Sequence, residues 1–117
     1  MKIAITSQNK HEITGHAGKC RKFWIYDITD NKIGQKTLLE LPKEQSFHES
    51  SPQLPHPLDD VQVLITGGMG TGLFRRLEMK NITGIVTSEK EPDKAIMAYL
   101  AGTLEQGAPH THHGHQH

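Results

Sequence analysis

The feature that most constrains the fold is a strand–turn–helix pattern in the second half of the chain. Residues 61–66, VQVLIT, are rich in β-branched side chains and almost continuously apolar, which is typical of a parallel strand buried on both faces. The glycine-rich run GGMGTG follows at 67–72, and apolar side chains then recur at helical spacing over 73–81. A buried strand that leads through a turn into a helix is the repeating unit of α/β proteins, so the sequence predicts an α/β fold.

Four more strands are expected from short apolar runs bounded by turn-forming residues. They cover residues 2–6, 22–28, 35–41 and 83–88. The strand 22–28 carries apolar or aromatic side chains on both faces, Phe23 and Ile25 on one and Trp24, Tyr26 and Ile28 on the other. This pattern favours a central strand over an edge strand, with Trp24 and Tyr26 in the core.

The remaining segments complete the predicted topology. Residues 42–60 carry four prolines and little periodicity, so we expect a loop or crossover with one short helical turn near Leu58. A last helix is expected to begin at Pro92 and to be ended by Gly107 and Pro109. The order β-β-β, crossover, β-α-β-α predicts a mixed five-stranded sheet with helices packed on it.

Composition excludes several classes of function. The 117 residues suit one domain, which we place at 1–106, and 13 basic residues balance 13 acidic ones. A balanced charge gives no electrostatic basis for binding nucleic acid or an anionic membrane surface. No apolar run approaches the roughly 20 residues that cross a bilayer, and the N-terminus lacks a signal peptide's apolar region, so a cytoplasmic protein is expected.

Histidine is concentrated at the C-terminus. Residues 107–117 contain no large apolar side chain that could compensate for the entropy of ordering, so we expect a disordered tail. Its histidines are His110, His112, His113, His115 and His117. Closely spaced imidazoles in a flexible segment bind divalent metals, and the interrupted pattern favours a native accessory metal site over a purification tag.

The glycine turn is the first candidate site. Backbone N–H groups at the start of a helix that follows such a turn can bind an anion. The run lacks the Gly-Lys-Ser/Thr of a phosphate-binding loop, and Leu73 stands where the last glycine of G-x-G-x-x-G would be. The alternative is a tight turn that requires glycine for positive φ. The candidate anion-binding residues are Gly67, Gly68, Gly70, Thr71 and Gly72.

His16 and Cys20 form the second candidate site. A thiolate and an imidazole are both suitable donors for zinc, copper, iron or a preformed cluster, and Gly15 and Gly18 argue against a helix between them. Nearby Lys19, Arg21 and Lys22 would lower the pKa of the thiol. The alternative is a loop histidine beside a buried, unreactive cysteine. No third group is nearby to orient a Cys–His nucleophile, so we expect a protein that is not an enzyme.

Together these stretches resemble a known family. GHAGKCRKFWIYDI (15–28) is similar to the His-x-Gly-x-Cys-x-x-Phe-x-x-Tyr segment of the dinitrogenase iron–molybdenum cofactor biosynthesis family, of the NifX/NafY type. VQVLITGGMGTGLFRRLEMKNITGIVT (61–87) resembles that family's strand, glycine turn, helix and following strand, and EPDKAIMAYLAGTL (91–104) resembles its closing helix. The likeness covers roughly residues 1–105.

The resemblance implies a ribonuclease-H-like, three-layer α/β fold that carries an iron–molybdenum cofactor or its precursor cluster to an acceptor protein. It places His16 on the family's cluster-binding histidine and Cys20 on the cysteine of its nitrogenase-associated branch. It places Gly67, Gly68, Gly70 and Gly72 on the family's glycine turn. Ala17 departs from the family's usual phenylalanine. The strand 2–6 has no carboxylate, which disfavours the nuclease activity of proteins with this fold.

The leading hypothesis is therefore a non-catalytic carrier, monomeric or homodimeric, for an iron–molybdenum or related iron–sulfur cluster. Lys19 and Arg21 would favour the anionic cluster, and the acceptor or assembly protein would be its partner. One alternative is a regulatory module that binds a small anion or nucleotide at Gly67–Gly72 without a metal cluster. Another is a metal buffer in which only the histidine tail binds metal.

Overall fold

The computed structural model describes residues 1–109 and confirms the predicted α/β architecture. The elements are β1 (Lys2–Thr6), β2 (Lys22–Thr29), β3 (Lys32–Glu40), the 3₁₀ turn η1 (Lys43–Gln45), β4 (Val63–Thr66), α1 (Thr71–Met79), β5 (Thr83–Val86) and α2 (Pro92–Ala101). The sheet order is β3-β2-β1-β4-β5. β1 pairs with β4, and β4 with β5, in parallel, whereas β2 is antiparallel to both of its neighbours.

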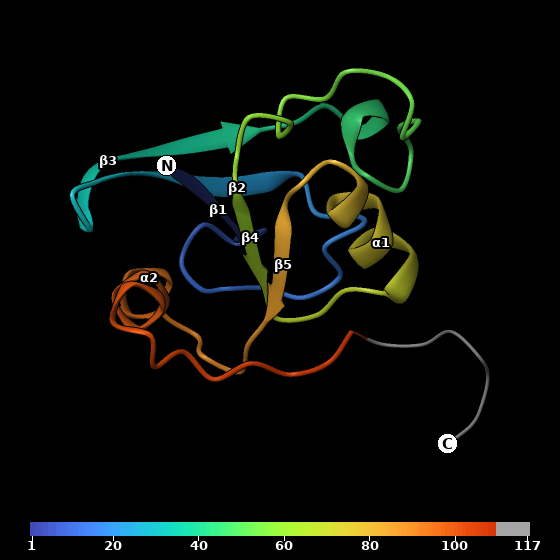
Figure 1. The fold of residues 1–117 in the computed structure, drawn as a ribbon. Helices are drawn as coiled ribbons and strands as arrows, with labels where there is room; N and C mark the ends of the chain where they lie inside the picture. The colour runs from blue at the N-terminus through green and yellow to red at the C-terminus, as the bar shows by residue number, and fades with distance from the viewer. Residues whose placement is uncertain (110–117) are drawn as a thin grey trace.

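Side-chain alternation divides the core between the two faces of the sheet. Ala4, Leu64 and Phe23 lie in the core that α1 covers, together with Leu77 of that helix. The opposite face of the same strands, including Tyr26, packs with residues of α2. The helices thus lie on opposite faces, giving three layers (Figure 1). The predicted division of the strand 22–28 is confirmed, and the ribonuclease-H-like classification stays a prediction.

Several element boundaries differ from the predicted ones. β3 begins at Lys32 because Asp30 and Asn31 both adopt positive φ, 52° and 61°, and close a two-residue hairpin. α2 ends at Ala101 because Gly102 adopts φ 76° and caps it; the predicted stop at Gly107 was wrong. The sequence was misleading here because Leu104, beyond the helix, still packs on the core at a helix-like spacing.

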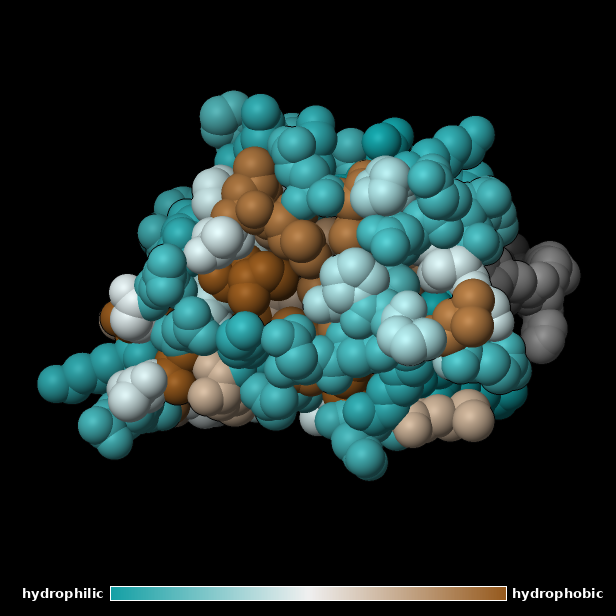
Figure 2. Space-filling view, turned by 90° about the horizontal axis from the view of Figure 1, so that it is seen from above, coloured by the Kyte–Doolittle hydropathy of each residue, from teal (hydrophilic) through white to brown (hydrophobic). Residues whose placement is uncertain are grey.

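The crossover between β3 and β4 contains little regular secondary structure and is held in place mainly by its buried apolar side chains. Its helical turn is η1, whereas hydrogen-bonded turns occupy the region of Leu58. Leu41, Phe47, Leu58 and Val61 are all buried in the α1-side core. Seen from above, on the side where β3 and this crossover lie, hydrophobic residues gather in a hollow rimmed by hydrophilic ones (Figure 2). Among the described residues, no helix is long and apolar enough to span a membrane.

Gly84 in β5 sets how closely α1 approaches the sheet. A Cβ placed there would lie 2.9 Å from Met69 Cε and 3.3 Å from both Leu77 Cδ1 and Phe74 Cδ1. Gly84→Ala is expected to lower the free energy of unfolding by about 1 to 3 kcal/mol through overpacking, measured by urea denaturation. Gly34→Ala is the matched strand control, because its Cβ meets only Asp27 O at 3.5 Å. Equal stability of the two variants would contradict this packing account.

Candidate functional site

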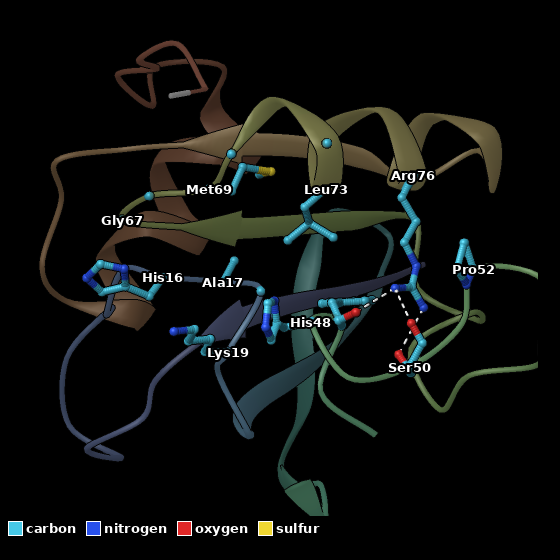
Figure 3. A pocket seen from close by; sticks show the side chains of 16 residues that line it. His16, Ala17, Lys19, His48, Ser50, Pro52, Gly67, Met69, Leu73 and Arg76 are labelled. Atoms are coloured by element: carbon cyan, nitrogen blue, oxygen red, sulfur yellow. Dashed lines mark hydrogen bonds between the residues drawn. The ribbon is translucent and has the colours of Figure 1, made fainter. Parts of the chain in front are cut away.

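A cavity of about 930 Å³ lies at the carboxyl ends of the two central parallel strands. The chain leaves β1 toward β2 on one side and leaves β4 toward β5 on the other. Connections that diverge from adjacent parallel strands leave a crevice between them, where ligands of open α/β sheets bind. Three segments line the cavity: 15–19, 47–52 and 67–76 (Figure 3). The site therefore follows from the topology of the sheet.

Hydrogen bonds fix the first of these segments to the glycine turn. The hydroxyls of Thr6 and Thr66, 2.8 Å apart, both donate to the carbonyl of Thr14, at 2.6 and 3.1 Å. The Gly67 N–H also donates to that carbonyl, and the Ala17 N–H donates to Gly68 O, each at 3.0 Å. These bonds hold residues 14–17 against the start of the turn and so determine the shape of one end of the cavity.

The glycine turn does not use glycine for left-handed backbone. Among the described residues, Gly102 is the one glycine with positive φ. The alternative interpretation, that residues 67–72 are glycine-rich because the turn requires positive φ, is therefore wrong. Gly67 is needed for close approach, since a Cβ there would lie 3.3 Å from Thr14 C and O. A Cβ on Gly72 would meet nothing within 4 Å. Gly72 leaves the cavity wider than any other residue would.

The structure separates the two side chains of the His16–Cys20 candidate. His16 lines the cavity from a left-handed backbone conformation, φ 52°, which is uncommon for a non-glycine residue, and Lys19 lines it beside His16. Cys20 is 3% exposed, packs in the α1-side core and does not line the cavity. The structure thus brings His16 and Lys19 to the glycine turn and leaves the thiol among hydrocarbon.

The predicted lowering of the Cys20 pKa is wrong. Its Sγ–H donates to Lys22 O at 3.1 Å, and burial raises the pKa of the thiol despite the hydrogen bonds that favour the thiolate. The basic side chains around it in sequence do not produce a reactive thiolate. As a cluster contact, Cys20 stays a prediction that the geometry of the thiol does not favour.

The remaining predicted residues lie elsewhere. Arg21 faces a separate, smaller surface pocket, where its Nε donates to Leu41 O at 3.0 Å. Thr71 begins α1 but is not a lining residue of the 930 Å³ cavity, whereas Gly67, Gly68, Gly70 and Gly72 are. The five histidines of the C-terminal tail lie outside the described residues.

Sequence reasoning missed one wall of the cavity. The crossover contributes Phe47, His48, Ser50 and Pro52, and α1 contributes Leu73 and Arg76. No spacing in the sequence indicates that a proline-rich crossover lies against this helix. The available signal was the pair Arg75-Arg76 on a short helix that follows a glycine turn, since a cation there is suited to an anionic ligand.

Arg76 organises that wall. Its Nη1 donates to Phe47 O at 2.7 Å and to Ser50 O at 3.1 Å, and Nη2 donates to Ser50 Oγ at 3.0 Å. The guanidinium also lies 5.1 Å from the centre of the Phe47 ring. Its Nε is buried without a hydrogen-bond partner. Burial lowers the pKa of Arg76, but a guanidinium stays protonated in proteins.

The charge of the cavity is positive. Lys19 and Arg76 line it, and of the lining residues that the structure describes none carries a carboxylate. Within residues 1–109, no three histidine, cysteine, aspartate or glutamate side chains gather as a set that could hold a metal ion. The cavity is thus suited to an anion of some size and not to a bare metal ion that needs a full set of protein ligands.

A model of the family described as dinitrogenase iron–molybdenum cofactor matches residues 1–102. The chain belongs to this family. The match confirms the resemblance on which the sequence-based hypothesis relies, and it includes all three segments that line the cavity. No curated protein sequence matches the chain closely enough to add to this assignment.

Solved structures agree with the fold. PH0822 is 22% identical, with a TM-score of 0.73 over 91% of this chain and 94% of its own. The mj0327 protein from Methanocaldococcus jannaschii is 18% identical, with a TM-score of 0.68, and the match covers 93% of this chain and 96% of that protein. The apo form of the orange protein from Desulfovibrio gigas is 16% identical, with a TM-score of 0.64, and the match covers 92% of this chain and 93% of that protein. At these identities the likeness establishes the shared fold.

The buried thiol makes a direct prediction. Under native conditions iodoacetamide should alkylate Cys20 at least about 100-fold more slowly than in concentrated urea, because burial both blocks the thiol and disfavours the thiolate. Mass spectrometry of timed samples measures the two rates. Comparable rates in the two solvents would show that Cys20 is accessible and would restore it as a candidate ligand.

His56, which packs behind the crossover wall against Phe47, makes the stability of the fold depend on pH. Its Nε2–H donates to Gln45 O at 2.6 Å, while Nδ1 accepts from the Leu58 N–H at 3.0 Å, so the ring is neutral. Burial lowers the pKa of His56, and Arg76 and Lys80 lower it further, against the raising effects of the Gln45 carbonyl and Asp59. The unfolded chain therefore binds this proton more readily than the folded one below its ordinary pKa of about 6.5.

The free energy of unfolding should accordingly fall as the pH drops from 7.5 to 5.5, with His56 accounting for up to about 1.4 kcal/mol. His56→Gln should be less stable at pH 7.5 and should lose most of this pH dependence, and His11→Gln, at an exposed histidine, is the control. Urea denaturation at both pH values measures the difference. An unchanged slope in His56→Gln would assign the effect to other groups.

Proposed function

We propose that this protein is a non-catalytic carrier that binds an iron–molybdenum or related iron–sulfur cluster in the cavity and delivers it to an acceptor protein during cofactor biosynthesis. The observation that carries the proposal is a cavity lined by His16, Lys19, Arg76 and the glycine turn, without a carboxylate. Membership of the iron–molybdenum cofactor family supports the identity of the cargo.

Size and charge support a polynuclear cargo. A cavity of about 930 Å³ lies in the range of sites that enclose whole cofactors. Sulfide-bridged clusters are anionic, and the ammonium of Lys19 and the guanidinium of Arg76 would attract such an anion. The lining residues also include Ala17, Leu73 and Met69, whose apolar surfaces would shield the cluster from water.

The small number of protein donors supports transfer over permanent storage. A preassembled cluster brings its own bridging sulfides, so a carrier needs few side-chain bonds to hold it. His16 is the donor that the sequence and the cavity both indicate. Because few bonds must break, an acceptor with a fuller set of ligands would remove the cluster readily.

The described groups in the cavity favour binding over catalysis. Ser50 Oγ accepts from Arg76, and within residues 1–109 neither this hydroxyl nor the Cys20 thiol bonds to a histidine ring. A nucleophilic enzyme requires such a pair and a third group that orients it. We therefore assign no reaction to the site.

Anaerobic cluster assembly from ferrous iron, sulfide and tetrathiomolybdate tests the proposal. The tail histidines are replaced by alanine in the full-length chain, so that metal bound there does not contribute. His16→Ala in this background should weaken cluster binding by about 10- to 100-fold, measured by absorbance and metal content. His11→Ala is the matched control, because His11 is exposed and outside the cavity.

Two outcomes would contradict the proposal. Failure of the background chain, with His16 intact, to retain a cluster would remove the carrier function. Thermal stabilisation by ATP or inorganic phosphate, with none by the cluster, would instead favour the anion-binding module centred on Gly67–Gly72.

A further inference from the structure

His48 lies in the wall of the cavity that the crossover forms, and its role is not explained by packing. In Figure 3 the His16 and His48 side chains lie at different places along the cavity, with those of Ala17 and Lys19 between them. We propose that His48 is a second protein donor to the cargo, held at a fixed position relative to His16 by the crossover wall. This inference rests on the carrier function proposed above.

The backbone of His48 is firmly placed. Its N–H donates to Gly18 O at 2.7 Å, so the crossover is tied directly to the loop that carries His16. The preceding residue, Phe47, is held by Arg76 through its carbonyl and stacks on His56 with ring centres 4.7 Å apart. Two cavity-lining imidazoles are therefore attached to segments that cannot move far relative to each other.

The His48 ring itself makes no bond that the fold requires. Its side chain is 60% exposed, and its nearest charged partner is Glu49, whose Oε2 lies 3.8 Å from Nε2. That separation is too long for a hydrogen bond, and an exposed pair of this kind contributes little to stability. The ring is thus free to act as a ligand, while Phe47 and His56 on the same segment perform the packing.

The arrangement indicates the class of ligand. A neutral imidazole is a suitable donor for iron, copper and zinc. A single zinc ion would take three or four protein ligands, and the described residues provide no such set here. Two imidazoles with other side chains between them suit a cluster that exposes two metal atoms and brings its own sulfides. The second donor would also fix the orientation of the cluster in the cavity.

The test again uses the full chain without tail histidines, loaded anaerobically from ferrous iron, sulfide and tetrathiomolybdate. The variants are His48→Ala, His16→Ala and the control His11→Ala, each labelled with ¹⁵N-histidine. Pulsed electron paramagnetic resonance of the paramagnetic cluster counts coupled imidazoles, and the rate of iron transfer to a chelator measures retention. The background chain should show two couplings, and His48→Ala should show one with about tenfold faster release.

Arg76→Lys separates charge from positioning. It keeps the cation but loses the several bonds that hold Phe47 and Ser50, so the His48 coupling should weaken while that of His16 remains. Circular dichroism confirms that each variant is folded. Two couplings and unchanged release in His48→Ala would overturn this inference and leave the carrier function standing. A background chain that retains no cluster would overturn both.

Discussion

The parallel pairing of β1 with β4 is the constraint on which the rest of the molecule depends. Both strands are buried on both faces, and they end in Thr6 and Thr66, whose fully buried hydroxyls both donate to the carbonyl of Thr14. This arrangement satisfies polar groups inside the core and simultaneously draws the His16 loop across the strand ends. The cavity exists because the chain leaves these two strands in opposite directions.

Much of the fold could be predicted from local patterns. The two-faced apolar strand at residues 22–28, the buried strand before the glycine turn and the proline at the start of α2 each have a short-range physical cause, and each is found in the structure. The position of His16 beside the glycine turn followed from the family resemblance. These features depend on neighbours in sequence or on the order of motifs.

The other side of the site could not be predicted in this way. Whether Cys20 faces the cavity or the core depends on how the chain turns after His16, and the basic residues around it gave a misleading indication of its acidity. The wall formed by Phe47 and His48 depends on Arg76, which is 28 positions further along than His48. Contacts of this kind arise from packing between segments that are distant in sequence, so the local patterns of a single sequence do not predict them.

The three segments that line the cavity, 15–19, 47–52 and 67–76, lie far apart in the chain. The cavity is complete only after β4 has inserted beside β1 and α1 has closed over the crossover. A partly synthesised or partly folded chain therefore lacks the complete cavity. A ligand that binds only the folded chain also stabilises it, so a ligand bound in this cavity would protect all three segments from proteolysis together.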